Sequence, residues 1–316
     1  MSNGFTKFLR RCRDNYYLST LLAYSAKPLH SVSRRVAVRI ERSIRKNGVT
    51  IRLPNGKDLT IGRDAGIAIG SLLFWHGLDG YEPETSRTLR FLFERAATFI
   101  DVGANCGLYS VLGALWNPNL QVIAFEPVPE IFEGLRRNVR LNRLESRVHC
   151  ENIALSSQSG RATFFLPMQE GLDSESTGTL ATESWQARKG SPRLEVQTMK
   201  FDEYEGLHPI HVDLVKIDVE DFEADVLQGM HATIMRDRPF IVCEVLPRPH
   251  RNQRTREIVE ALNYHTYWIT PTGYVRVPHF DFSRGSFTDF LLSPVSTPDV
   301  VIDNLDVLWE LKQQMG

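Results

Sequence analysis

The sequence has few cysteines, and none of them forms a closely spaced pair of the kind that binds a metal or carries out redox chemistry. The four cysteines, at positions 12, 106, 150 and 243, include no C-x-x-C motif, so we interpret them as buried or incidental thiols in a reducing compartment. No apolar run reaches the ~18 residues that a membrane-spanning helix needs. The N-terminus also shows no apolar signal-peptide region, and we therefore expect a cytoplasmic protein.

The sequence also lacks the net positive charge that is typical of nucleic-acid-binding proteins. Its 37 basic and 38 acidic residues leave a net charge of −1, and we expect no nucleic-acid partner. The charge is unevenly distributed, because residues 1–46 hold eleven Lys or Arg and two acids, a net +9. We interpret this segment as the solvated helix faces of an N-terminal extension. A weak contact with an anionic membrane or a lipid-linked substrate is the alternative.

The chain is organised around an apolar strand that turns through glycine into a helix. Residues Thr98–Val102 predict a buried strand, Gly103 ends it, and Gly107 opens a helix that runs through Leu115. Glycine lets the backbone approach a ligand closely because it has no Cβ, and a helix start directs free N–H groups to the same place. Such a corner is typical of anion and nucleotide sites. A plain strand–turn–helix without a ligand is the alternative.

The next predicted strand, Gln121–Phe125, ends in a carboxylate that suits an adenosine ribose. Glu126 lies 23 residues after Gly103, where an acid can accept hydrogen bonds from both ribose hydroxyls. Proteins that bind NAD share this feature. The third glycine of G-x-G-x-x-G is missing, however, and Asp101 would repel a pyrophosphate. An acid at that position suits a cationic ligand such as S-adenosylmethionine.

Three motifs in this order resemble those of the FkbM family of S-adenosylmethionine-dependent methyltransferases. They are Asp-Val-Gly-Ala-Asn-Cys-Gly at 101–107, Phe-Glu-Pro at 125–127 and Lys-Ile-Asp-Val-Glu at 216–220, and the resemblance covers about residues 80–246. It implies an α/β fold of the Rossmann-like class I methyltransferase type, with a mostly parallel seven-stranded sheet and helices on both faces. The chain departs from the family at Asp221, where the family pattern has glycine. Glycine at this point in the family suggests a positive φ or a close approach of the backbone, and we expect Asp221 to adopt the positive φ.

The resemblance also implies which residues hold the cofactor, S-adenosylmethionine. The end of the third predicted strand, within residues 147–154, falls where this architecture places the adenine. The expected cofactor-binding residues are Asp101, Gly103, Asn105, Gly107, Glu126, Asn152 and Ala154.

The chain divides by pattern into an extension and a main domain. Residues 1–80 are read as the basic N-terminal extension, with helical segments and a β-hairpin, because Asn55-Gly56 is a strong turn signal between two alternating segments. Residues 81–316 are read as the methyltransferase domain, whose alternating strands and helices predict a parallel sheet. The stretch 168–192, rich in Ser, Thr, Gly and Glu, is interpreted as a lid over the acceptor site. An insertion of no consequence is the alternative.

Carboxylates lie at the ends of four predicted strands, at Asp101, Glu126, Asp218 and Glu244. The carboxyl ends of parallel strands meet at one edge of a sheet, and ligands bind there. An alcohol that attacks a methyl group must lose its proton as the new bond forms. We therefore assign Asp218 as the base or the clamp for the acceptor, and we place Glu220 beside it in the catalytic site.

Other candidates for the chemistry are weaker. Asp218 with Glu244 offers oxygen ligands for Mg²⁺, but we can place no third ligand and expect no metal. His211 and His250 are weaker candidates for the base, since a surface or core role suits each of them.

The sequence therefore predicts a methyltransferase that acts on a hydroxyl group. The preference for oxygen is what the resemblance implies, with a small molecule, a glycan or a lipid-linked compound as acceptor. Two other classes stay open. A nicotinamide-dependent oxidoreductase would bind NAD and not S-adenosylmethionine, and a non-catalytic binding module, suggested by Asp221, would bind S-adenosylmethionine and transfer nothing.

Overall fold

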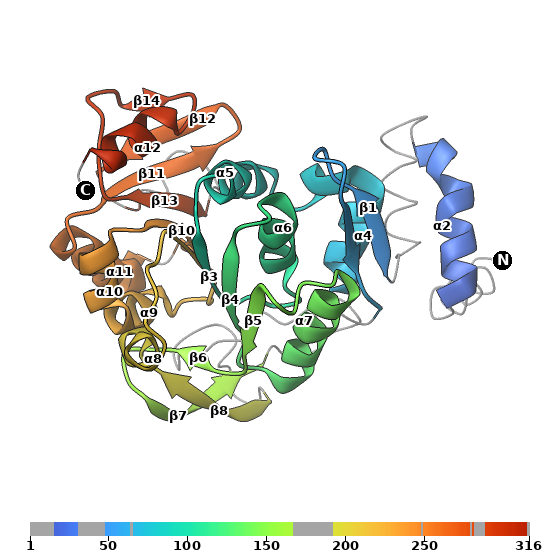
Figure 1. Ribbon diagram of the computed structural model, residues 1–316, viewed down its shortest axis with the longest axis horizontal. Helices are drawn as coiled ribbons and strands as arrows, with labels where there is room; N and C mark the ends of the chain where they lie inside the picture. The colour runs from blue at the N-terminus through green and yellow to red at the C-terminus, as the bar shows by residue number, and fades with distance from the viewer. Residues whose placement is uncertain are drawn as a thin grey trace.

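The computed structural model describes residues 16–30, 48–63, 66–166, 192–247, 249–278, 280 and 288–314. Within these ranges the main sheet has nine strands in the order β14-β12-β11-β13-β10-β9-β3-β4-β5 (Figure 1). Their bounds are β3 (Thr98–Val102), β4 (Gln121–Phe125), β5 (Val148–Glu151), β9 (Leu214–Ile217), β10 (Phe240–Glu244), β11 (His265–Thr270), β12 (Gly273–Val277), β13 (Asp289–Ser293) and β14 (Val301–Ile302). The first strand of the predicted corner, β3, lies near the centre of the sheet, as expected for a doubly wound fold.

The Rossmann-like α/β class is confirmed, but the sheet is larger and more mixed than the seven mostly parallel strands we expected. Strands β5, β4, β3, β9 and β10 are parallel neighbours, whereas β13, β11, β12 and β14 continue the sheet through antiparallel pairs. The additional strands arise because the chain turns back at Pro271-Thr272, which places β12 beside β11. Strand β14 then pairs with β12.

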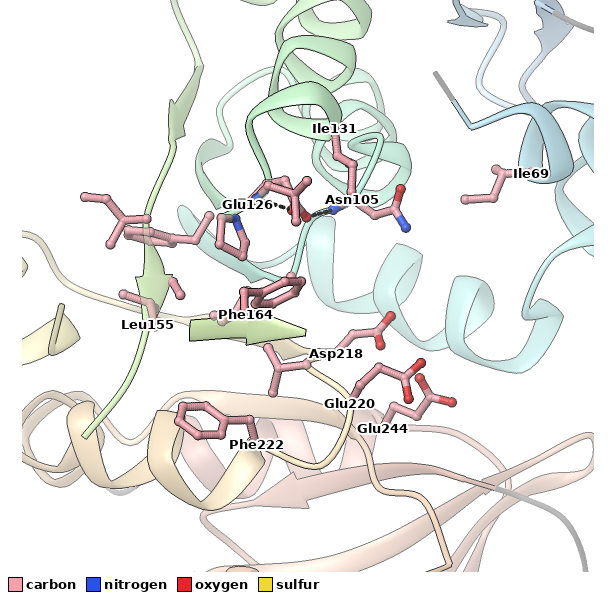
Figure 2. Close-up of a pocket in the computed structure, with 18 of the residues that line it drawn as sticks. Ile69, Asn105, Glu126, Ile131, Leu155, Phe164, Asp218, Glu220, Phe222 and Glu244 are labelled. Atoms are coloured by element: carbon pink, nitrogen blue, oxygen red, sulfur yellow. Dashed lines mark hydrogen bonds between the residues drawn. The ribbon is translucent and has the colours of Figure 1, made fainter. Parts of the chain in front are cut away.

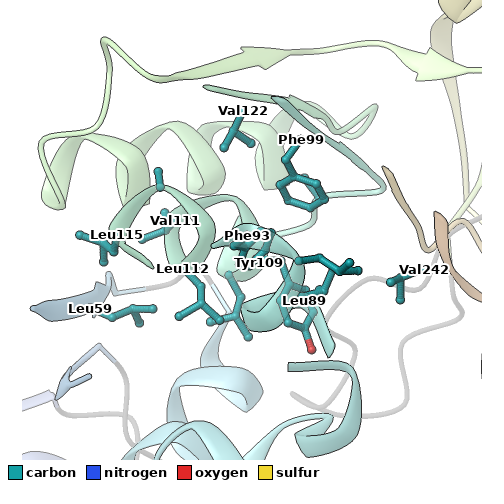
Figure 3. Packing of buried hydrophobic residues seen from close by; sticks show 14 of the residues in the cluster. Leu59, Leu89, Phe93, Phe99, Tyr109, Val111, Leu112, Leu115, Val122 and Val242 are labelled. Atoms are coloured by element: carbon teal, nitrogen blue, oxygen red, sulfur yellow. The ribbon is translucent and has the colours of Figure 1, made fainter. Parts of the chain in front are cut away.

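Helices cover both faces of this sheet, and each face has its own apolar core. On one face lie α5 (Pro83–Phe93), α6 (Leu108–Trp116), α7 (Pro129–Leu141) and α12 (Asp306–Gln313). On the other lie α8 (Phe201–Leu207), α9 (Glu223–Gly229), α10 (His231–Asp237) and α11 (Pro249–Ala261). Successive side chains of a strand point to opposite faces, so on β3 Phe99 joins the first core (Figure 3) while Ile100 and Val102 join the second.

The predicted hairpin before the main sheet is confirmed, and it is packed against that sheet's first core. Strands β1 (Val49–Arg52) and β2 (Asp58–Ile61) pair antiparallel, and Gly56 in the turn has a φ of 80°. The chain then forms α4 (Ile67–His76) and a short 3₁₀ helix, η1 (Gly77–Gly80). Leu59 and Leu73 belong to the same core as Phe99, so apolar packing is continuous across residue 80.

Only one part of the basic N-terminal segment is described. Helix α2 (Tyr16–His30) lies at the outer end of the molecule in Figure 1, where Tyr24 contacts Phe74 of α4 edge to face, with 5.1 Å between ring centroids. The rest of residues 1–46 lies outside the described residues, and the membrane contact stays a prediction. None of the helices in the described ranges is long and apolar enough to cross a bilayer.

A second, small sheet lies beside the carboxyl edge of the parallel strands. It contains β6 (Ala154–Leu155), β8 (Arg193–Met199) and β7 (Gly160–Phe165) in that order. The chain between β7 and β8 includes residues 167–191, which lie outside the described residues. The predicted lid at 168–192 falls almost entirely there.

Candidate active site

A cavity of about 320 Å³ opens at the carboxyl ends of β3, β4, β9 and β10 (Figure 2). One half is mostly apolar and surrounds Glu126 with Ile131, Leu155 and Phe164. The other half is acidic and contains Asp218, Glu220, Glu244 and Glu82. Six of the predicted site residues line the cavity: Gly103, Asn105, Glu126, Ala154, Asp218 and Glu220. The structure thus brings the predicted cofactor and catalytic residues to one place.

Glu126 is fixed by the backbone of the loops that surround it. Its side chain accepts hydrogen bonds from the N–H groups of Asn105 (3.0 Å) and Val128 (2.9 Å), and only 5% of the residue is exposed. Burial raises the pKa of Glu126 to about 7, although the two backbone hydrogen bonds oppose this shift. A carboxylate can accept about four hydrogen bonds, so this geometry leaves acceptor positions for a ligand's hydroxyl groups.

Asn152 and Gly107 support the cavity without lining it. The Asn152 side-chain amide donates to the carbonyl oxygens of Glu126 (2.8 Å) and Pro127 (3.0 Å), which fixes the end of β4. Gly107 caps α6 with a φ of 81°, and a Cβ there would overlap the Leu135 side chain of α7. These residues hold the walls in place, so a direct contact with the cofactor stays a prediction for both.

Asp101 lies behind the cavity wall, unlike the other three strand-end acids. It is 1% exposed and accepts a 2.5 Å hydrogen bond from the Ser110 hydroxyl of α6. Burial raises its pKa, while Lys216 and Ser110 oppose the shift. The side chain does not line the cavity, because on β3 it points to the same face as Phe99, toward α6.

Gly103 is required by the contact between two strand ends. Its φ is 76°, and a Cβ would overlap the carbonyl oxygen of Asp218 at the end of β9. Glycine therefore allows the loops after β3 and β9 to lie against each other beneath the cavity. We had attributed this glycine to the close approach of a ligand, and the structure adds a packing reason.

In the acidic half of the cavity, Asp218 forms an ion pair with a buried lysine. Lys216 Nζ lies 2.7 Å from Asp218 Oδ2, and 5% of the lysine side chain and 23% of the aspartate side chain are exposed. Burial disfavours the ionised form of Asp218, but Lys216 and a hydrogen bond with Glu244 outweigh burial and lower its pKa. Burial and the charge of Asp218 raise the pKa of Glu244 to about 10.

The alternatives for metal and base are not favoured by this arrangement. The described residues hold no group of three His, Cys, Asp or Glu side chains arranged around a metal position, and the absence of a metal stays a prediction. His211 precedes β9, at the opposite edge of the sheet, and contacts Asp237 at 3.1 Å. The side chain of His250 lies outside the described residues.

Several wall residues were missed by sequence reasoning. Glu82 lines the cavity and accepts a 2.8 Å hydrogen bond from the Tyr109 hydroxyl, and Tyr81 also donates to it. Ala68 and Ile69 of α4 line the same side. The sequence does hold a signal for Glu82, because Pro83 directly after it is typical of the first turn of a helix, and Glu82 precedes α5.

Several non-glycine residues around the cavity have a left-handed backbone conformation. Glu82, Asn105 and Glu220 line it with φ values of 40°, 52° and 50°, and the neighbouring Asp221 has a φ of 73°. Left-handed conformations cost non-glycine residues free energy, and they persist where the surrounding structure fixes them, often at functional sites. The expected positive φ at Asp221 is thus present, and aspartate tolerates it better than most residues.

The comparisons with known proteins agree with this geometry. The model of the methyltransferase FkbM domain matches residues 101–268. The chain belongs to the FkbM methyltransferase family. Membership removes the nicotinamide-dependent oxidoreductase as an interpretation of the glycine corner. The match begins at residue 101, so Ala68, Ile69, Tyr81 and Glu82 lie outside it.

Several curated methyltransferases are similar to part of the chain. Methyltransferase sdnD of Sordaria araneosa is 32% identical over an alignment of 155 residues that covers 42% of this chain and 59% of that protein. The 31-O-demethyl-FK506 methyltransferase FkbM of Streptomyces tacrolimicus is 40% identical over 67 residues, 21% of this chain and 25% of that protein. The hexuronic acid methyltransferase AglP of Haloferax volcanii is 29% identical over 161 residues, 50% of this chain and 60% of that protein. The chain thus spans less than two thirds of the length of these relatives.

Solved methyltransferases are also similar in structure. The methyltransferase FkbM of Methylobacillus flagellatus KT matches with a TM-score of 0.40 and 13% identity, over 74% of this chain and 56% of that protein. An O-methyltransferase of Bacillus cereus in complex with SAH matches with a TM-score of 0.39 and 13% identity, over 66% of this chain and 81% of that protein.

Proposed function

We propose that the protein transfers a methyl group from S-adenosylmethionine to a hydroxyl group of a sugar, a glycan or a natural product. The observation that carries this proposal is the two-part cavity, in which Glu126 lies in an apolar half and Asp218 in an acidic half. Family membership supports methyl transfer. The names of two relatives, a hexuronic acid methyltransferase and a 31-O-demethyl-FK506 methyltransferase, support oxygen as the atom that is methylated.

The cofactor fits the apolar half by its chemistry. Glu126 has free acceptor positions for the two ribose hydroxyls, and Ile153, Leu155 and Phe164 offer apolar surface to an adenine. When bound, S-adenosylmethionine supplies an electrophilic methyl group. This chain's residues then have to hold the attacking oxygen in line with that methyl, and such positioning is worth about 7–11 kcal/mol of the barrier.

Asp218 is the residue we place against the attacking hydroxyl. Its lowered pKa makes it a weak base toward a resting alcohol. As the carbon–oxygen bond forms, however, the oxygen becomes positively charged and its proton strongly acidic, so an ionised carboxylate can take it. Glu220 lines the same half of the cavity and is placed to bind further polar groups of the acceptor.

Two measurements test the proposal. Calorimetry with S-adenosylhomocysteine should show binding, and mass spectrometry of glycans, lipids and small molecules from cells with and without the gene should show the loss of one CH₂ unit from the product. Binding without any methylated product would favour the non-catalytic module. No binding would contradict the proposed cofactor.

The affinity for S-adenosylhomocysteine should depend on pH through Glu126. Because burial raises the pKa of Glu126 to about 7, ionisation between pH 6 and 8 should strengthen the hydrogen bonds from the ribose and raise the affinity by up to roughly tenfold. Glu126→Gln should remove this pH dependence and weaken binding at pH 8 by about 1.5–3 kcal/mol. Calorimetry at three pH values measures both effects. Glu130→Gln, an exposed residue of α7, is the control, and the same pH dependence in the Glu126 variant would remove Glu126 from the ribose site.

Asp221→Gly tests the departure from the family pattern. Glycine should relieve the left-handed conformation and raise the free energy of unfolding by up to about 1 kcal/mol, with little effect on S-adenosylhomocysteine affinity. Burial, with a contribution from the charge of Asp221, raises the pKa of Glu223 to about 8. Removal of the Asp221 charge should lower the pKa of Glu223, and we expect the pH–rate profile of methyl transfer to shift with it. Urea unfolding and rates across pH measure these effects, with Asp221→Ala as the strained control. An inert wild type that the glycine variant restores to activity would support the binding-module interpretation.

A further inference from the structure

The acidic half of the cavity places Lys216 among several carboxyl groups, most of which have other hydrogen-bond donors. Lys216 is 4% exposed, and Asp218, Glu82 and Asp101 all favour its charged form, against the effect of burial. Glu82 accepts from Tyr109, and Asp101 accepts from a serine of α6. The hydrogen bond that Lys216 donates goes to Asp218, which stays ionised.

The second partner of Asp218 is another carboxyl group. Strands β9 and β10 are parallel neighbours in which Ile217 lies opposite Cys243, so the next residues, Asp218 and Glu244, meet at the strand ends. The two side chains are hydrogen-bonded to each other, and Figure 2 shows both in the same corner of the cavity. Two carboxyl groups can share a hydrogen bond only when one of them carries a proton.

The surroundings assign that proton to Glu244. Asp218 is the partner next to the lysine, so its negative charge is compensated. Glu244 lies opposite Asp289 of β13 in the sheet, and a second negative charge there would face both Asp218 and Asp289. Glu244 Oε1 also accepts a hydrogen bond from the Thr288 hydroxyl at 3.3 Å, which leaves its other oxygen as the donor to Asp218.

We propose that Glu244 acts as a neutral carboxylic acid that, together with Lys216, positions the ionised Asp218 to take the proton of the acceptor hydroxyl. This inference rests on the proposed function. In the step, the oxygen forms a bond to the methyl carbon, the bond from that carbon to sulfur breaks with its electron pair left on sulfur, and the O–H proton passes to Asp218. Lys216 and Glu244 touch neither reacting atom, so both are positioning residues.

Other titratable groups lie near this pair. Asp289 comes from β13, Glu82 precedes α5, Glu223 begins α9, and Glu220 lies in the same loop as Asp218. Burial raises the pKa of Asp289 to about 7, so Asp289 gains charge as the pH rises through neutrality. That charge disfavours ionisation of Glu244 and keeps the proton on it in the neutral range.

The protonation state can be measured without any acceptor. In protein labelled with ¹³C at the glutamate side-chain carboxyl, the Glu244 signal is assigned by its disappearance in Glu244→Gln. We expect its chemical shift to stay that of a carboxylic acid from pH 6 to 8 and to change only near pH 10. A Glu244 signal that is ionised at pH 7 would overturn the proposal, whether or not the protein binds S-adenosylhomocysteine. Loss of that binding would count against the proposed function alone.

The positioning role has its own readout in the methyl-transfer rate. Glutamine has the shape of the protonated acid and keeps a donor for Asp218, so Glu244→Gln should lose only a few-fold in rate. The rate of Glu244→Gln should also stay constant at alkaline pH, where the rate of the wild type falls because Glu244 ionises. Glu244→Ala should be slower by about 100-fold, because Asp218 loses its orientation. Two outcomes would rule out this role: equal losses of rate in the two variants, or a glutamine variant whose rate still falls at alkaline pH as that of the wild type does.

Discussion

Gly103→Val should abolish S-adenosylhomocysteine binding and strongly destabilise the fold. The left-handed φ of 76° alone costs a residue with a Cβ about 1–2 kcal/mol, and the Cβ would overlap the Asp218 carbonyl oxygen. The loops after β3 and β9 would have to separate, which displaces the Asp218 side chain from the cavity. We expect a total loss of about 3–5 kcal/mol in the free energy of unfolding. Urea unfolding and calorimetry measure the two effects.

Two further variants make this result interpretable. Gly103→Ala has the same Cβ as the valine variant but none of its further atoms, so it should lose less of the free energy of unfolding while still losing most of the affinity. Gly206 of α8 is exposed and a Cβ there meets nothing within 4 Å, so Gly206→Ala should leave binding unchanged. If the alanine variant at position 103 binds normally, the close contact between these loops is not what shapes the cofactor site.

Lys216→Met should cost about 3–5 kcal/mol of the free energy of unfolding at pH 7, because it leaves the charge of Asp218 buried without its partner. The lysine lowers the pKa of Asp218 below its unfolded value, so this stabilisation is present above about pH 4 and is lost as the pH falls through the folded pKa. The raised pKa of Lys216 keeps its own contribution present up to alkaline pH. In Lys216→Met, burial without the lysine should raise the pKa of Asp218, so this carboxyl takes up a proton in the folded variant as the pH falls. The deficit of the variant should then shrink between pH 7 and pH 4, as measured by urea unfolding at both values.

The control for this prediction is a lysine on the surface. Lys200 lies 3.5 Å from Glu203 with both side chains about half exposed, and such pairs contribute little. Lys200→Met should behave like the wild type at both pH values. A deficit in Lys216→Met that is the same at pH 7 and pH 4 would mean that lost packing, and not the charge of Asp218, explains it.

The local parts of the site were predictable from the sequence, and the parts set by long-range packing were not. The corner from β3 to α6 and the acid after β4 follow from glycine positions and apolar runs that span few residues. Whether a strand-end acid points into the cavity depends on which face of the sheet the cavity occupies. Glu126 lines the cavity and Asp101 lies behind its wall for this reason.

The same distinction explains the missed elements of the fold. The strands predicted from apolar runs are present. Strand β14 has only two residues, and both β12 and β14 pair with strands whose position depends on the whole sheet. Ile69 and Glu82 reach the cavity because the hairpin and α4 pack on the main core, which no local pattern records. The positive φ at Asp221 was predictable because the family pattern has glycine at that position.

The wall formed by α4 and the residues before α5 has a consequence for how this protein diversifies. Glu126, Ile131, Leu155 and Phe164 lie inside the matched family domain, whereas Ala68, Ile69, Tyr81 and Glu82 come from the chain before it. Insertions and substitutions in this upstream segment would reshape one wall of the cavity while the strand ends that surround Glu126 keep their geometry. Under the proposed function, exchange of residues 66–82 between homologous enzymes should therefore change the acceptor and leave S-adenosylhomocysteine binding unchanged.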